Sequence, residues 1–116
     1  MSKTQIWHNP RCSKSRATLV VLEQNGITPE IILYLETPPS VEALTQAIRQ
    51  LDINARDLLR KGEDAYKELN LKNQDLSDQQ LIEAMASHPK LIERPIVFHN
   101  DSARIGRPPE QVMELF

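Results

Sequence analysis

The first 35 residues constrain the fold most, because a strand, a helix and a second strand follow one another within this short span. The segment "TQIWH" is rich in β-forming residues and is followed by a turn at Asn9-Pro10. The segment from about Cys12 to Gln24 contains an apolar run and stops at Asn25-Gly26, which favours a helix. In "PEIILYLE", the apolar run Ile31 to Leu35 suits a strand buried on both faces. This order predicts a βαβ unit with two parallel strands.

The middle of the chain, at about residues 40–88, favours helices. Ser40 is a good N-cap for a helix whose inner face consists of Val41, Leu44, Ile48 and Leu51. The segment "ARDLLRKGEDAYKEL" indicates one or two short helices interrupted at Gly62. A further helix begins with the capping-box pair Ser77 and Gln80 and ends before a proline; its inner face consists of Leu81, Ile82 and Met85. We therefore expect a helical insert.

The C-terminal part favours a hairpin followed by a helix. Residues 96–98 and 103–105 are expected to be strands joined by a polar turn at Asn100-Asp101, and a last helix is expected over residues 109–115. The complete order is β-α-β, helical insert, β-β-α. This order predicts an α/β, thioredoxin-like fold, with a four-stranded mixed sheet flanked by helices and the insert between the βαβ and ββα halves. We expect one domain over residues 1–116.

Composition restricts the possible partners. The formal net charge of −2 gives no general affinity for nucleic acid or for an anionic membrane. The N-terminus lacks the apolar run of a signal peptide, and no stretch approaches a membrane span, so a cytoplasmic location is expected. The chain has one cysteine and therefore cannot form an internal disulfide.

That cysteine, Cys12, lies in "HNPRCSKSR", at the expected start of the first helix. Helix N-termini and nearby cations favour the thiolate form, and Arg11, Lys14 and Arg16 are close in sequence. His8 would add to this effect if protonated. An exposed, reactive thiolate is the preferred interpretation. The alternative is a small buried apolar residue, which is the commonest role of a free cysteine.

The surrounding pattern excludes several thiol chemistries. Cys12 to Ser15 is C-x-x-S, so a dithiol exchange within the site is excluded, and Thr18 stands where a C-x5-R phosphatase would have arginine. Cys12 with His8, His88 and His99 has no spacing that recurs in zinc sites, so we expect no metal. What remains is a monothiol that needs an external thiol, such as glutathione or a glutaredoxin, to resolve its adduct.

Three arginines are candidates for binding an oxyanion beside this thiol. Arg60, Arg94 and Arg107 lie in breaks or at strand ends, and the last two directly precede prolines, which favours extended backbone. Each alone suits a surface charge or an ion pair. Together they could bind a tetrahedral anion, since each guanidinium can donate two N–H bonds to adjacent oxygens. Sequence spacing does not show whether they converge.

Five segments in this order resemble the ArsC-type, glutaredoxin-linked arsenate reductases over essentially the whole chain: "HNPRCSKSR", "IILYLETPP", "LLRKGEDAYKEL", "HPKLIERPIV" and "IGRPPEQV". The resemblance implies that Cys12 is the nucleophile toward arsenate, that His8 favours its thiolate, and that the Ser15 hydroxyl bonds to that thiolate. It also implies that Arg60, Arg94 and Arg107 bind the oxyanion and that Pro95 is a cis-proline.

The resemblance further implies that arsenate is reduced to arsenite without a bound cofactor. Glutathione would be the co-substrate and glutaredoxin a transient partner. Two alternatives remain open. One is a monothiol oxidoreductase acting on another glutathione-linked substrate. The other is a non-enzymatic redox regulator of the same fold, which Ser15 disfavours because typical regulators carry C-x-x-C.

Overall fold

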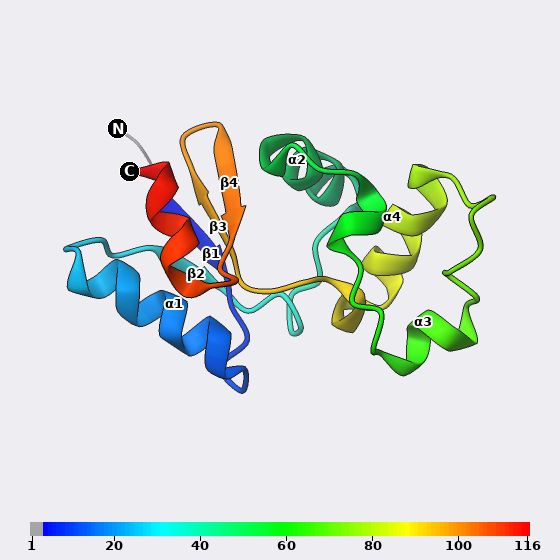
Figure 1. Cartoon of the computed structure of the whole chain (residues 1–116), viewed down its shortest axis with the longest axis horizontal. Helices are drawn as coiled ribbons and strands as arrows, with labels where there is room; N and C mark the ends of the chain where they lie inside the picture. Colours follow the sequence, from blue (N-terminus) through cyan, green and yellow to red (C-terminus); the bar gives the residue numbers. More distant parts are fainter. Residues whose placement is uncertain (1–3) are drawn as a thin grey trace. The chain divides into compact units, whose positions relative to one another are not determined.

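The computed structural model describes residues 4–116, which form two compact units (Figure 1). The sheet unit consists of residues 4–37 and 94–116, and the helical unit is the continuous segment 38–93. The helical unit contains the whole of the predicted insert and extends slightly beyond it at both ends. None of the helices within residues 4–116 is long and apolar enough to cross a membrane.

The sheet unit has the predicted four strands, β1 (Thr4–Trp7), β2 (Glu30–Ile32), β3 (Ile96–His99) and β4 (Ser102–Ile105), in the order β2-β1-β3-β4. Strand β1 pairs with β2 in parallel and with β3 antiparallel, and β3 pairs with β4 antiparallel. The sheet is therefore mixed, as the β-α-β and β-β-α order predicts.

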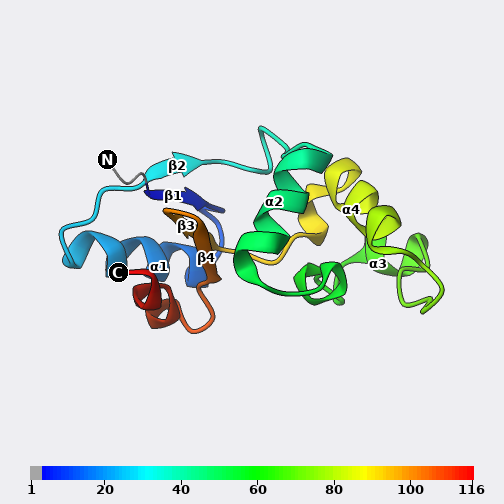
Figure 2. The same ribbon diagram turned by 90° about the horizontal axis from the view of Figure 1, so that it is seen from above.

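Helix α1 (Ser13–Gln24) and the 3-10 helix η3 (Pro109–Leu115) pack side by side along the sheet (Figure 2). The core between them is formed by Ile6, Leu22, Val97 and Val112, all fully buried. Ile6 and Val97 are directly paired across β1 and β3, so their side chains lie on the same face of the sheet. The predicted thioredoxin-like fold class, a mixed sheet flanked by helices, is confirmed.

Strand β2 differs from the prediction. It ends at Ile32, and a turn follows in which the N–H groups of Glu36 and Thr37 donate to the Leu33 carbonyl. Ile31 is 48% exposed and Leu35 is 37% exposed, so the expectation that this run is buried on both faces is wrong. The reason is topological: β2 is an edge strand, and an apolar run alone does not distinguish an edge from a centre.

The helical unit contains α2 (Val41–Leu51), α3 (Asp64–Glu68), α4 (Asp78–Ser87) and the 3-10 helices η1 (Ala55–Leu58) and η2 (Pro89–Leu91). Both predicted caps are present: the Ser40 side chain accepts from the N–H of Ala43, and Ser77 and Gln80 form a reciprocal capping box. Helix α4 packs on α2, η1 and η2. Their facing apolar side chains, buried at the centre, are Leu44, Leu58, Leu81, Met85 and Leu91.

Candidate active site

The candidate residues of the sheet unit come together because four segments meet at one end of the sheet, where β1, β2 and β4 end and β3 begins. Trp7, the last residue of β1, pairs with Ile32 at the end of β2 and with Ile96 at the start of β3. Ile96 in turn pairs with Ile105 at the end of β4. Four segments therefore lie at this end of the sheet: the loop after β1, the turn after β2, Arg94-Pro95 and Gly106-Arg107.

Cys12 is the N-cap of α1 and has extended backbone angles. Its N–H donates to the Asn9 carbonyl at 3.0 Å, and its own carbonyl accepts from the Arg16 N–H at 3.0 Å. This places the residue at the first turn of a twelve-residue helix, where N–H groups without helical partners favour a negative charge.

The prediction that Cys12 is exposed is wrong, since only 9% of the residue is accessible. The burial of Cys12 does not desolvate the neighbouring cations, because Arg11, Lys14 and Arg16 are all exposed. Consecutive residues at a helix start point in different directions, so the turn closed on Asn9 buries the thiol while the cations remain in solvent.

The guanidinium of Arg107 is hydrogen-bonded to the sulfur of Cys12. Its Nη2 lies 3.9 Å from Sγ of Cys12, and its Nε donates to the Arg94 carbonyl at 2.9 Å. The guanidinium is thus held against the thiol by the backbone of a second candidate arginine. In the side chain of Arg94, Nε and Nη1 are buried. The Arg94-Pro95 bond is cis, as the resemblance implies, and so is the Arg107-Pro108 bond.

Gly106 is a residue of the site that sequence reasoning missed. Its N–H donates to the Pro95 carbonyl at 2.9 Å. A Cβ atom at this position would lie 2.3 Å from Oγ1 of Thr18 and 2.8 Å from Cγ of Pro95. Only glycine allows this close approach of β4's end to α1 and the cis-proline, which sets the path of the next residue, Arg107. The available signal was a glycine at the end of a predicted strand.

His8 and Ser15 form a buried pair that spans the thiol loop, which is the segment 8–12 between β1 and α1 that carries Cys12. Nδ1 of His8 lies 2.6 Å from Oγ of Ser15, and the N–H of Asn9 donates to the same Oγ at 3.0 Å. Burial, and then the charge of Arg16, lower the pKa of His8 from its ordinary value. A lowered pKa favours the neutral imidazole, so the protonated form considered above is disfavoured. The hydrogen bond of Ser15 to a thiolate stays a prediction.

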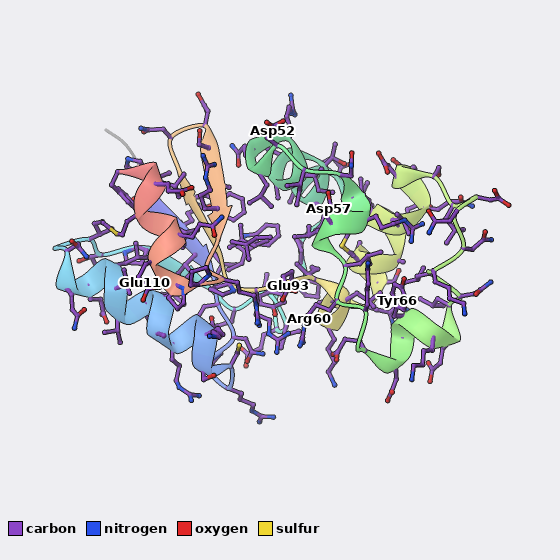
Figure 3. All side chains as sticks on the ribbon, viewed as in Figure 1. Asp52, Asp57, Arg60, Tyr66, Glu93 and Glu110 are labelled. Carbon is purple, nitrogen blue, oxygen red and sulfur yellow. The ribbon has the colours of Figure 1, made fainter. Side chains whose placement is uncertain are left out.

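Arg60 lies in the helical unit, after an isolated bridge between Leu59 and Ile92. Its N–H donates to the Leu91 carbonyl at 2.8 Å. Its Nε lies 3.6 Å from Glu93 and its Nη1 lies 3.8 Å from Glu63; Figure 3 shows Arg60 beside Glu93. The structure therefore brings Cys12, Arg107 and the Arg94 backbone together and gives Arg60 carboxylate partners. The convergence of all three arginines stays a prediction.

The other two histidines have ordinary surroundings. Nδ1 of His99 lies 2.9 Å from Oγ1 of Thr4, and its ring packs against Phe116. His88 is the exposed C-cap of α4. Within residues 4–116, no three His, Cys, Asp or Glu side chains are grouped so that they could hold a metal ion.

A single cysteine at the N-cap of the first helix, next to a four-stranded mixed sheet, is the arrangement of a thioredoxin-like protein with one thiol. Residues 7–115 match the ArsC family, and the chain belongs to this family. It is 56% identical to the uncharacterized protein YfgD of Escherichia coli K12, over 97% of this chain and 96% of the relative. It is 50% identical to a Haemophilus influenzae protein named arsenate reductase, over 95% and 96% of the two chains.

A solved structure described as arsenate reductase from Vibrio cholerae has the same fold. The TM-score is 0.96, the sequence identity is 57%, and the match covers 98% of each chain. The strands and helices described above therefore follow the fold of ArsC-family proteins.

Proposed function

We propose that this protein reduces arsenate to arsenite, with Cys12 as the nucleophile and glutathione and glutaredoxin as the external thiols. The observation that carries the proposal is the position of the Arg107 guanidinium, 3.9 Å from the only sulfur nucleophile of the chain. Relatives that are named arsenate reductases and match nearly the whole chain support the choice of anion.

The first step joins Cys12 to arsenic. The thiolate attacks the arsenic atom of arsenate, an S–As bond forms, an As–O bond breaks, and the oxygen leaves as water after taking up protons. Arsenic remains in the +5 state, because this step is a condensation. In this proposal Arg107 donates N–H bonds to the anion's oxygens and balances the charge that develops on the departing oxygen.

The later steps need thiols from outside, because the chain has no second cysteine. Glutathione condenses with the same arsenic and releases another water. A glutaredoxin thiolate then attacks the glutathione sulfur, an S–S bond forms, and the electron pair of the S–As bond passes to arsenic, which becomes +3. Hydrolysis of the remaining S–As bond releases arsenite and the Cys12 thiol. Overall, two external thiols are oxidised to one disulfide.

The proposal is tested by following NADPH oxidation with arsenate, glutathione, glutaredoxin and glutathione reductase. We expect turnover by the natural sequence and a loss of at least about a thousandfold in Cys12→Ser, because serine is a much weaker nucleophile at neutral pH. Arg104→Ala is the matched control, since Arg104 lies on β4 of the same unit but pairs with Glu114. No arsenate-dependent turnover, or turnover retained by Cys12→Ser, would contradict the proposal.

A further inference from the structure

A cavity of about 230 Å³ adjoins the thiol loop within the sheet unit. One wall is formed by residues 8–11, the segment that leads directly into Cys12, and the other by Leu33, Leu35 and Glu36 from the turn after β2. The N–H of Cys12 donates to the carbonyl of Asn9, so the backbone of the nucleophile is held next to this wall, although Cys12 itself does not line the cavity.

The cavity lies on one side of β1 in the strand order, and Arg94 and Arg107 lie on the other. In the strand order β2-β1-β3-β4, the cavity uses the turn after β2, whereas Arg94 and Arg107 flank β3 and β4. Cys12 follows β1 and therefore lies between the two. An anion bound on the Arg107 side of the sulfur would therefore approach from the side of β1 opposite to the cavity.

The cavity wall is amphipathic and carries both signs of charge. Pro10, Leu33 and Leu35 give apolar surface, with Arg11 and Glu36 beside it. Both charged side chains are exposed, and no hydrogen bond or ion pair to either is found within residues 4–116. A zwitterionic ligand that places a carboxylate near Arg11 and an ammonium near Glu36 would match this surface.

We propose that this cavity binds the γ-glutamyl end of glutathione and so places its thiol beside the arsenic atom bound to Cys12. The γ-glutamyl group carries an α-carboxylate and an α-ammonium, the two charges that Arg11 and Glu36 would attract. This inference rests on the proposed function. In the step it assists, the glutathione sulfur forms a bond to arsenic while an As–O bond breaks and the oxygen leaves as water.

A kinetic comparison of two thiols tests the assignment. Cysteinylglycine has the same thiol as glutathione but lacks the γ-glutamyl group. In Glu36→Gln we expect the KM for glutathione to rise about fivefold, the size typical of a partly exposed ion pair, with unchanged KM values for cysteinylglycine and arsenate. Glu23→Gln is the control, because Glu23 is an exposed acid of α1 outside the cavity. An unchanged KM for glutathione in Glu36→Gln would overturn the inference.

A binding measurement separates this inference from the proposed function. S-methylglutathione, which cannot react, is titrated into the isotope-labelled protein while amide signals are followed by NMR. We expect concentration-dependent shifts at Leu33, Leu35 and Glu36, weakened in Glu36→Gln. Absence of shifts at these residues would overturn the cavity assignment even if arsenate is turned over. Shifts without arsenate turnover would support the cavity assignment and contradict the proposed substrate.

Discussion

The sheet unit and the helical unit each hold a candidate arginine next to an irregular segment, but they use it differently. In the sheet unit, Arg107 donates to a sulfur and to a backbone carbonyl. In the helical unit, Arg60 lies between two carboxylates, those of Glu63 and Glu93. A guanidinium hydrogen-bonded to the thiol lies where an anion bound to the sulfur would contact it, whereas one between two carboxylates must exchange those partners first. The comparison teaches that the partners of an arginine, more than its presence, decide its function.

The largest difference in kcat/KM for arsenate between variants of the two units is expected when these arginines are replaced by lysine. Arg107→Lys keeps the charge but loses the planar pair of donors, so kcat/KM for arsenate should fall about a hundredfold. Arg60→Lys should lower it about tenfold or less, because Arg60 is already paired with acids. Steady-state kinetics with arsenate varied measures both. Equal losses would show that the helical unit contributes to anion binding as strongly as the sheet unit.

A second contrast concerns the glycines of the two units. Gly106→Ala would place a methyl group within 2.3 Å of Thr18 and 2.8 Å of Pro95, whereas a Cβ at Gly62 meets nothing within 4 Å. We expect Gly106→Ala to lower the free energy of unfolding by about 2 kcal/mol and to lower arsenate turnover by displacing Arg107. Gly62→Ala should change stability by less than about 0.5 kcal/mol.

Urea denaturation followed by circular dichroism measures both glycine variants. If Gly106→Ala were as stable and as active as Gly62→Ala, the close approach of β4's end to α1 would not set the position of Arg107.

These contrasts also show which features could be predicted from the sequence. The caps at Ser40 and at Ser77 with Gln80 were predicted correctly, because a cap depends on residues within one helical turn. The order of strands and helices could be predicted for a similar reason, because each element is marked by residues within its own segment. The edge position of β2, the burial of Cys12 and the close packing of Gly106 were not, because each depends on segments distant in sequence.

The site was only partly predictable on the same grounds. Cys12 was recognisable from the cations and the helix start around it, and the family motifs indicated Arg94 and Arg107. These residues meet only because β1, β3 and β4 bring residues 12, 94 and 107 to the same end of the sheet. The pairing of His8 with Ser15, seven residues apart, similarly required the actual path of the thiol loop.

The smallest expected effect is the pH dependence that His8 gives to the sheet unit. The pKa of His8 is lowered in the folded protein, so between that value and its ordinary value of 6.5 the unfolded chain binds more protons. The stability that the neutral ring contributes is therefore present above pH 6.5 and is lost as the pH falls through this window. Urea denaturation at pH 7.5 and at pH 5.5 measures the loss.

His8→Gln should show a smaller loss of stability over the same pH range, because glutamine does not titrate. His88→Gln is the control, since His88 is exposed at the end of α4 in the helical unit. The same loss in His8→Gln as in the natural sequence would contradict the assignment of this pH dependence to His8.

The most direct test of the central claim, that Cys12 and Arg107 act together on arsenate, is to detect the adduct itself. The protein is incubated with arsenate and glutathione without glutaredoxin, quenched, and its peptides are analysed by mass spectrometry. We expect arsenic on the peptide that contains Cys12 in the natural sequence and in Arg104→Ala, and a strong reduction in Arg107→Ala. The absence of an arsenic adduct on Cys12, or its undiminished formation in Arg107→Ala, would contradict the claim.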